Sequence, residues 1–130
     1  MRTLLYLSTL CFALFLLPGC SDKPADGTYV TMFVINKIGI TEEGREVYVF
    51  KELNNQGAQK KPSDALEVKY TDGNGMVQFN LEQPDLFEAD ESAVFSFQVM
   101  EFQDGDFVTL ASFEKEIKPG DIVNHTLTLQ

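Results

Sequence analysis

The fold class is decided by residues 66–81, which read LEVKYTDGNGMVQFNL. Two short segments, Leu66–Tyr70 and Met76–Leu81, have apolar residues at every second position, which is typical of a strand with one buried face. The residues between them, Asp72-Gly73-Asn74-Gly75, tolerate the positive φ that tight turns need. This stretch therefore predicts a β-hairpin.

The same rhythm continues on both sides of this hairpin. Turn residues at Gln103–Asp106 and Pro119–Asp121 separate further apolar, β-branched and aromatic runs, and no stretch keeps a helical period. We expect seven strands, at Thr28–Asn36, Glu46–Leu53, Ala65–Thr71, Met76–Leu81, Ala93–Phe102, Phe107–Phe113 and Ile122–Leu129. So many strands in about a hundred residues predict an all-β, antiparallel sandwich of two sheets.

Three segments resemble a known family. They are Glu46–Phe50, Thr71–Phe79 and Lys118–Asp121, the last followed by a terminal Leu-Thr-Leu strand. This order of strands and turns resembles the transthyretin-like, or prealbumin-like (Cna-B-type), sandwich family. The resemblance implies an immunoglobulin-like or transthyretin-like fold and confers no function.

Some Cna-B-type domains form an isopeptide bond between a lysine and an asparagine, assisted by a buried carboxylate. By this resemblance, Lys37, Asn124 and Glu101 are the residues that would take these roles. Their spacing does not single them out, so the bond remains a minor alternative.

The N-terminus differs from the rest of the chain. Arg2 is followed by Leu4–Leu17, a run of fourteen residues that is uncharged and interrupted only by Ser8 and Thr9. A positive residue before a short apolar core is typical of an export signal. A membrane-spanning helix needs about 20 apolar residues, so this run is too short to be one.

The end of this segment reads Leu17-Pro18-Gly19-Cys20 and resembles the lipobox of bacterial lipoproteins, in which an aliphatic residue and two small residues precede the cysteine. The resemblance implies that residues 1–19 are a cleaved signal peptide and that Cys20 carries the lipid. Residues 20–27 would then be a lipidated tether to the domain at 28–130. Pro18 departs from the usual Ala, Ser or Thr.

Two or three acyl chains hold a protein on a membrane much more firmly than the marginal attachment that one myristoyl chain gives. We therefore predict a cell-envelope protein anchored to a membrane through Cys20. By the sorting rule of enteric bacteria, Ser21 favours the outer membrane over the inner one.

Charge restricts the possible partners. Lys and Arg number 10 and Asp and Glu 20, which gives a net charge of −10. Only Arg2 among the charged residues lies in the signal, so the mature chain is one unit more negative. Such a charge repels phosphate backbones and anionic membrane surfaces. We therefore expect no nucleic-acid partner and a domain that stands off the bilayer.

Side chains that perform catalysis or bind metals are scarce. Cys11 leaves with the signal, Cys20 carries the lipid, and His125 is the single histidine. Catalytic triads, zinc sites and histidine iron centres need more imidazoles or thiolates. His125 alternates with Val123 and Leu127, which predicts an ordinary sheet residue. The hydrolase branch of the transthyretin family ends in Tyr-Arg-Gly-Ser, unlike this chain. We therefore predict no catalytic residue, no metal, no cofactor and no enzyme activity.

Calcium binding is one alternative. Asp72, Asn74, Asp104 and Asp106 carry oxygen atoms that suit calcium. Neither turn contains the remainder of an EF-hand loop, and turn formation explains all four residues. We therefore favour the turn.

Carbohydrate binding is another alternative, because sandwiches recognise sugars through exposed aromatic platforms. The chain contains no Trp, and Tyr29, Tyr48 and Tyr70 lie inside expected strands. We predict that these tyrosines pack in the core. Tyr29 or Tyr48 on an outer face would reopen the carbohydrate hypothesis.

Two connections are long. Glu82–Ser92 contains Phe87, which we expect to cap the core from a short helix. Asn54–Asp64 is polar and contains Lys60 and Lys61, the only adjacent basic pair of the mature chain. Long connections of this kind are either mobile or functional. Lys60 and Lys61 are therefore the candidate contact for an acidic partner, with an idle loop as the equal alternative.

These observations predict a membrane-anchored envelope lipoprotein that acts as a non-catalytic binding or scaffolding module for a protein partner. The alternative is a module at the same location that binds carbohydrate or calcium.

Overall fold

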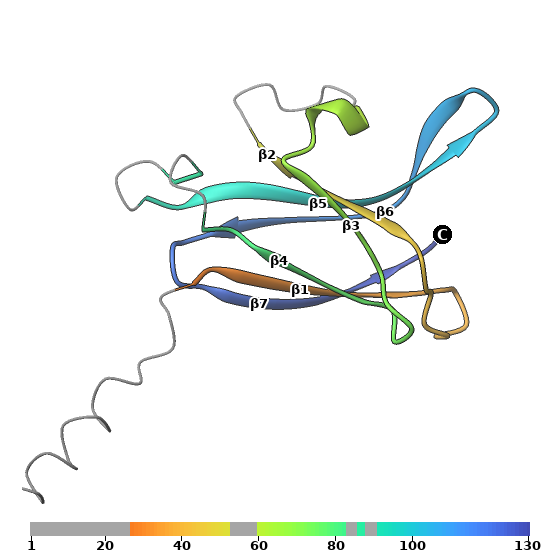
Figure 1. Ribbon diagram of the computed structural model, residues 1–130, viewed down its shortest axis with the longest axis horizontal. Coiled ribbons are helices and arrows are strands. Elements are labelled where there is room, and N and C mark those ends of the chain that lie inside the picture. Colours follow the sequence, from red (N-terminus) through yellow and green to blue (C-terminus); the bar gives the residue numbers. More distant parts are fainter. Residues whose placement is uncertain (1–26, 53–59, 83–85, 88–90) are drawn as a thin grey trace, which may run out of the picture.

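The computed structural model describes residues 27–52, 60–82, 86–87 and 91–130. These residues form β1 (Tyr29–Ile35), β2 (Glu46–Lys51), a short 3-10 turn η2 (Pro62–Asp64), β3 (Glu67–Tyr70), β4 (Met76–Asn80), β5 (Ala93–Gln103), β6 (Asp106–Ile117) and β7 (Ile122–Thr128). A three-stranded sheet, β4-β1-β7, packs on a four-stranded sheet, β3-β2-β5-β6 (Figure 1). The predicted seven-stranded, two-sheet sandwich is confirmed. β6 ends four residues later than expected, at Ile117.

One strand pair departs from the antiparallel prediction. β1 pairs with β7 in parallel, from Tyr29 opposite Ile122 to Ile35 opposite Thr128. The chain arrives at β7 from β6 in the other sheet, so it enters beside the start of β1, where the Tyr29 amide donates to the Asp121 carbonyl at 3.0 Å. A crossover of this kind permits parallel pairing, which a tight hairpin does not.

The turn at Asp72–Gly75 forms as expected, but the strands on either side of it do not pair with each other. β3 pairs with β2 and β4 pairs with β1, so the turn carries the chain from one sheet to the other. Gly75 has a φ of 71°, and a Cβ there would lie 2.7 Å from the Val34 carbonyl oxygen. The predicted hairpin is therefore wrong: the turn is hydrogen-bonded to the end of β1, and the strands on either side of it belong to different sheets.

The main core lies between the sheets. Phe79 and Leu127, which alternation places on inward faces, are 0 % and 2 % exposed. The rings of Phe79 and Phe97 lie 5.8 Å apart and join the two sheets. Phe87 packs edge-on against Phe95 at 5.5 Å, as expected for a residue that caps the core. The short helix expected around it falls largely on residues 83–85 and 88–90, outside the described residues.

Several other predictions also lie outside the described residues. They concern the signal peptide, Cys20, nearly all of the tether and residues 53–59 of the long polar connection. In the part of the chain that is described, no helix has the length and apolar character to cross a membrane.

Candidate functional site

The four-stranded sheet carries a second apolar cluster on its outward face. Val47 and Val49 of β2 point into the main core, whereas Tyr48 and Phe50 point outward and pack with Met100 of β5. Ala65 and Phe107 partly cover this cluster. β2 is therefore buried on both sides, which a two-layer sandwich does not require.

Exposed apolar residues surround this cluster. Val68 and Tyr70 of β3 stand opposite Tyr48 and Glu46 in the strand register, so they share the outward face. Phe102 stacks edge-on with Phe107 at 5.2 Å across the β5–β6 hairpin. We call this surface the aromatic face, and its members are Tyr48, Phe50, Val68, Tyr70, Met100, Phe102 and Phe107.

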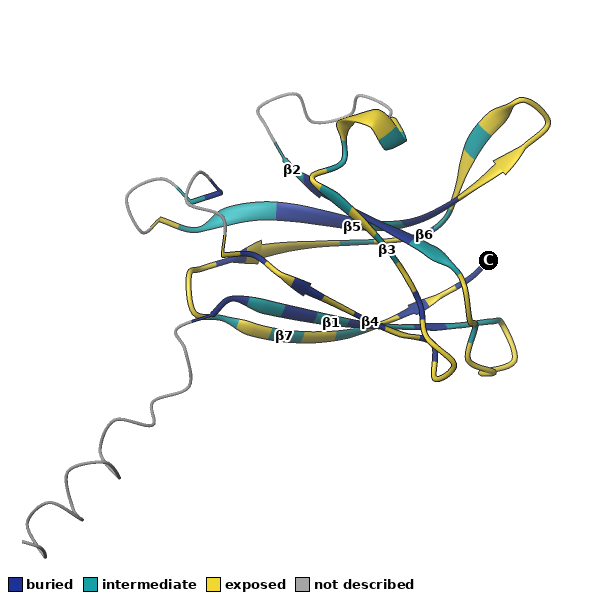
Figure 2. Ribbon diagram, viewed as in Figure 1, coloured by how far each residue is buried: buried dark blue, intermediate teal, exposed yellow. Residues whose placement is uncertain are grey.

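The aromatic face has a buried floor and an open rim. Tyr48 is 7 % exposed, whereas Tyr70 and Phe102 are 63 % and 62 % exposed. Figure 2 shows the same gradient along β5, which is buried over the sandwich and exposed toward the β5–β6 turn, whereas β6 is exposed over much of its length. Apolar rings at a protruding, exposed end of a sheet are typical of interaction surfaces.

The face is hollowed between β2 and the β5–β6 hairpin. A groove of about 420 Å³ is lined by Glu46, Tyr48, Met100 and Phe102 among others. Phe107 lines this groove and also a second hollow of about 550 Å³. Both volumes lie within the range of small-ligand pockets.

A carboxylate held by two phenols lies in the groove. The Tyr48 hydroxyl donates a short hydrogen bond to Glu46 Oε2, and the Tyr70 hydroxyl donates to Glu46 Oε1 at 3.3 Å. Burial, together with the hydrogen bond to Glu46 and its negative charge, raises the pKa of Tyr48 to about 12, and burial is the largest of these causes. Tyr48 therefore keeps its proton at neutral pH and remains a donor to Glu46.

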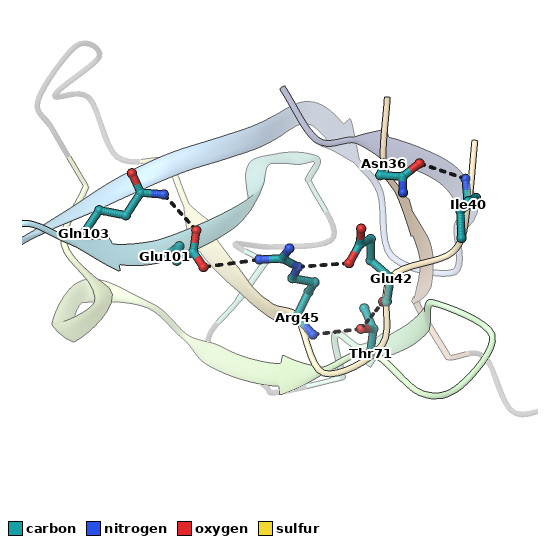
Figure 3. Close-up of polar contacts among 7 residues, drawn as sticks. All are labelled: Asn36, Ile40, Glu42, Arg45, Thr71, Glu101 and Gln103. Carbon is teal, nitrogen blue, oxygen red and sulfur yellow. Dashed lines mark hydrogen bonds and ion pairs between the residues drawn. The ribbon is translucent and has the colours of Figure 1, made fainter. Parts of the chain in front are cut away.

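One end of the groove is fixed by Arg45 (Figure 3). Its Nε lies 3.4 Å from Glu42 Oε2, and its Nη1 lies 3.4 Å from Glu101 Oε1. Gln103 Nε2 donates to Glu101 Oε2 at 2.8 Å. The buried Thr71 hydroxyl donates to the Glu42 carbonyl at 2.6 Å and accepts from the Arg45 amide at 2.9 Å. These contacts join the β1–β2 loop, the end of β3 and the β5–β6 hairpin.

The β1–β2 loop is also ordered by its own first residue. Asn36 Oδ1 accepts hydrogen bonds from the Ile38 and Ile40 amides, each at 3.0 Å (Figure 3 shows the second). An asparagine that bonds its own backbone in this way stabilises a turn. The loop therefore holds Glu42 and Arg45 in place beside the groove.

The structure separates the two lysines of the predicted partner loop. Lys60 Nζ lies 2.5 Å from Glu52 Oε1, and the Glu52 side chain is only 8 % exposed. The charge of Lys60 is therefore balanced internally. Lys61 is exposed and lines the second hollow together with Asp106 and Phe107. The described part of this loop thus adjoins the aromatic face, with one exposed cation in place of the expected pair.

Two aspartates of the turns accept hydrogen bonds from backbone amides. Asp72 Oδ1 accepts from the Asn74 and Met76 amides at 2.9 and 3.0 Å, and Asp106 Oδ1 accepts from the Phe107 amide at 2.8 Å. Among the described residues, no group of three or more His, Cys, Asp or Glu side chains could hold a metal ion.

His125 is a sheet residue, as predicted. Its ring stacks on Phe113 with centroids 3.6 Å apart, and burial lowers its pKa. The isopeptide residues are not brought together. Asn124 is exposed in the three-stranded sheet, Glu101 contacts Arg45 beside the four-stranded sheet, and Lys37 is exposed in the β1–β2 loop.

The prediction that the tyrosines pack in the core is wrong for Tyr48 and Tyr70. Tyr48 is buried in the outer cluster, and Tyr70 is largely exposed. The reason is the phase of β2, in which Val47 and Val49 take the inward positions. Tyr48 is therefore turned outward, together with the residues of β3 that stand beside it.

Sequence reasoning missed the groove residues Glu46, Tyr48, Met100, Phe102 and Phe107. A usable signal was present in Val47-Tyr48-Val49-Phe50, which is apolar at four consecutive positions. A strand with one solvent-facing side alternates with polar residues, so an unbroken apolar run indicates that both sides make contacts.

Comparisons with known proteins give the fold alone. No family model matches the chain, and no curated protein matches it. A dioxygenase domain from Streptomyces sp. SirexAA-E, part of a dioxygenase carbohydrate-binding protein fusion, is 12 % identical with a TM-score of 0.49, over 85 % of this chain and 83 % of that one. A 3-chlorocatechol 1,2-dioxygenase from Rhodococcus opacus 1CP is 14 % identical with a TM-score of 0.42, over 84 % of this chain and 61 % of that one.

These comparisons correct one prediction. Both similar structures are dioxygenases, which contradicts the prediction that the chain is not an enzyme. That prediction depended on the scarcity of histidine and cysteine in the sequence. We therefore withdraw it.

Proposed function

We propose that the chain is a lipid-anchored protein of the bacterial cell envelope that binds a partner protein through its aromatic face. The observation that carries the proposal is the second apolar cluster, with exposed rings around a groove of about 420 Å³. A buried floor with an aromatic rim is the arrangement in which hot-spot residues of protein interfaces are found.

The anchor is supported by the sequence alone. Leu17-Pro18-Gly19-Cys20 resembles a lipobox and follows a charged and then apolar segment. Seven tether residues, Ser21–Gly27, reach at most about 25 Å. The domain would therefore remain close to its membrane, with the outer membrane favoured by Ser21.

The orientation of the domain supports this combination of anchor and binding face. The chain enters β1 at one end of the sandwich, whereas the β5–β6 hairpin projects from the other end (Figure 1). A lipid on Cys20 would therefore tether the end that is remote from Phe102 and the groove. The binding face would point away from the anchoring membrane, where a partner can reach it.

A glycan is the second candidate ligand. Tyr48 lies on an outer face, which is the condition under which the sequence left carbohydrate binding open. Tyr70 is exposed beside it, and Glu46 between them offers a planar polar group. We place this second because Tyr48 itself is almost fully covered.

The anchor is tested by intact mass spectrometry of the mature N-terminus, which should show an acylated cysteine. Cys20→Ser should abolish both acylation and membrane fractionation. An unmodified N-terminus at another residue would contradict this part of the proposal.

The binding face is tested by a double variant, Tyr70→Ser with Phe102→Ser, in affinity capture from envelope extract. The matched control is Met76→Ser with Ile122→Ser, which removes exposed apolar residues from the other sheet. We expect the first variant to lose captured proteins and the control to keep them. If both variants capture the same proteins as the unaltered chain, the aromatic face is not the site.

A further inference from the structure

Glu46 differs from the neighbouring glutamates in the side chains that it contacts. Glu42 and Glu101 contact Arg45, Glu52 contacts Lys60, and Glu67 lies 3.7 Å from Lys69. Within the described residues, Glu46 forms no ion pair. It accepts instead from the hydroxyls of Tyr48 and Tyr70.

These two hydroxyls fix the position of the carboxylate before any ligand arrives. Tyr48 is almost fully buried and Tyr70 stands opposite Glu46 in the strand register. A side chain that is already ordered loses little conformational entropy when it binds. Phenol donors are neutral, so they orient the carboxylate without cancelling its charge.

The surroundings of Glu46 favour a cation. The groove is walled by Tyr48, Met100, Phe102 and Phe107, and aromatic faces attract ammonium and guanidinium groups. Apolar walls also weaken the screening of a charge by water. The charges at the groove sum to a negative value, because Glu42, Glu46 and Glu101 outnumber Arg45. The chain as a whole carries −10.

We propose that the groove binds a lysine or arginine side chain from a basic segment of the partner, with Glu46 as its counter-ion. This inference rests on the proposed function, because it names the chemistry that the aromatic face recognises. It reverses the charge expected from Lys60 and Lys61, because Glu52 balances Lys60 and the groove beside the loop is acidic. Charge complementarity of this kind guides partners and selects among them.

The test uses the mature protein, purified from membranes in nonionic detergent, and a synthetic hexapeptide of alternating arginine and alanine. A second peptide with citrulline in place of arginine keeps the shape and removes the charge. We expect the arginine peptide to bind in calorimetric titration and the citrulline peptide to lose at least about tenfold in affinity, as a charged hydrogen bond predicts.

Two matched variants locate the site. Glu46→Gln should reduce the affinity for the arginine peptide by about tenfold. Glu114→Gln, which removes an exposed carboxylate of β6 outside the groove, should leave it nearly unchanged. Phe102→Ala tests the aromatic wall at an exposed position and should also weaken binding. Unchanged melting temperatures would show that the variants fold.

Equal affinity for the two peptides, or an affinity that Glu46→Gln and Glu114→Gln lower alike, would overturn the inference. Tighter binding of a neutral oligosaccharide such as chitohexaose, lost in Phe102→Ala, would also overturn it in favour of a glycan. The envelope capture described above distinguishes this inference from the proposed function. If the Tyr70→Ser, Phe102→Ser variant loses captured proteins and Glu46→Gln keeps them, the groove does not bind a cation, whereas the aromatic face is still the binding site.

Discussion

The outward faces of the two sheets differ. In the three-stranded sheet, buried residues alternate with half-buried or exposed ones, as in β4. Its outward positions mix polar residues such as Thr31 and Gln78 with apolar ones such as Phe33 and Ile122, and none of these apolar residues belongs to a buried cluster of the described residues. In the four-stranded sheet, Tyr48, Phe50 and Met100 form a cluster outside the sandwich. A sandwich requires only the inward apolar faces. The outward cluster of the four-stranded sheet is therefore not needed for the fold, and we propose that it is the binding site.

The largest effect should come from the inner core. Phe79→Ala removes a ring that is 0 % exposed and contacts Phe97. Lost burial and the resulting cavity should lower the free energy of unfolding by about 3 to 5 kcal/mol. Denaturant titration measures this change. A loss of about 0.5 kcal/mol or less, the size of an ordinary surface change, would show that the sheets do not depend on this core.

A smaller loss of stability should distinguish the buried floor of the aromatic face from its exposed rim. Met100→Ala removes a side chain that is 4 % exposed and should cost about 2 kcal/mol. Phe102→Ala, two residues further along the same face, should change stability by about 0.5 kcal/mol or less. Thermal unfolding of both variants measures the contrast. Equal losses would mean that Phe102 serves folding.

Alkaline pH should weaken the fold through Tyr48. Its pKa is about 12 in the folded chain and 10.0 for an ordinary tyrosine, so the unfolded chain loses this proton first. The free energy of unfolding should therefore fall as pH rises from 10.0 toward about 12. The difference between the ultraviolet absorbance titrations of the unaltered chain and of Tyr48→Phe gives the pKa of Tyr48. Glu46→Gln should lower the pKa of Tyr48 only part of the way to 10.0, because burial contributes more to the shift than Glu46 does. A full return to 10.0 would show that Glu46 contributes more than burial.

The smallest change in stability should come from the titration of His125, on the inner face of β7. Burial against Phe113 lowers the pKa of His125 from its usual 6.5. The unfolded chain therefore takes up this proton first as pH falls below 6.5, and the stabilisation present above that pH is progressively lost. His125→Gln should remove this part of the pH dependence in unfolding curves between pH 8 and 5. An unchanged slope would mean that His125 does not titrate differently in the folded chain.

The strands were predictable because alternation and turn residues are local signals. Phe79, Leu127 and the Asp104-Gly105 hairpin follow from them directly. The partner of each strand was not predictable in the same way. The Asp72–Gly75 sequence indicates a turn in either case, and only the pairing of β3 with β2 and of β4 with β1 shows that it crosses between sheets.

The candidate site was less predictable than the fold. Lys60 and Lys61 were visible as an adjacent basic pair, but the contact of Lys60 with Glu52 depends on how the chain folds back. The groove combines β2 with a hairpin more than fifty residues away, so no local pattern contains it. The apolar run Val47–Phe50 was its one sequence signal, and it indicated two contacting faces without naming what they contact.

The comparison between the two faces is tested most directly by site-specific photo-crosslinking in living cells. A photoreactive phenylalanine analogue replaces Phe102 on the aromatic face or Ile122 on the other sheet, both of which are exposed. Our account predicts one discrete crosslinked adduct from position 102 that is absent from position 122. Adducts from position 122 alone, or the same adducts from both positions, would contradict it.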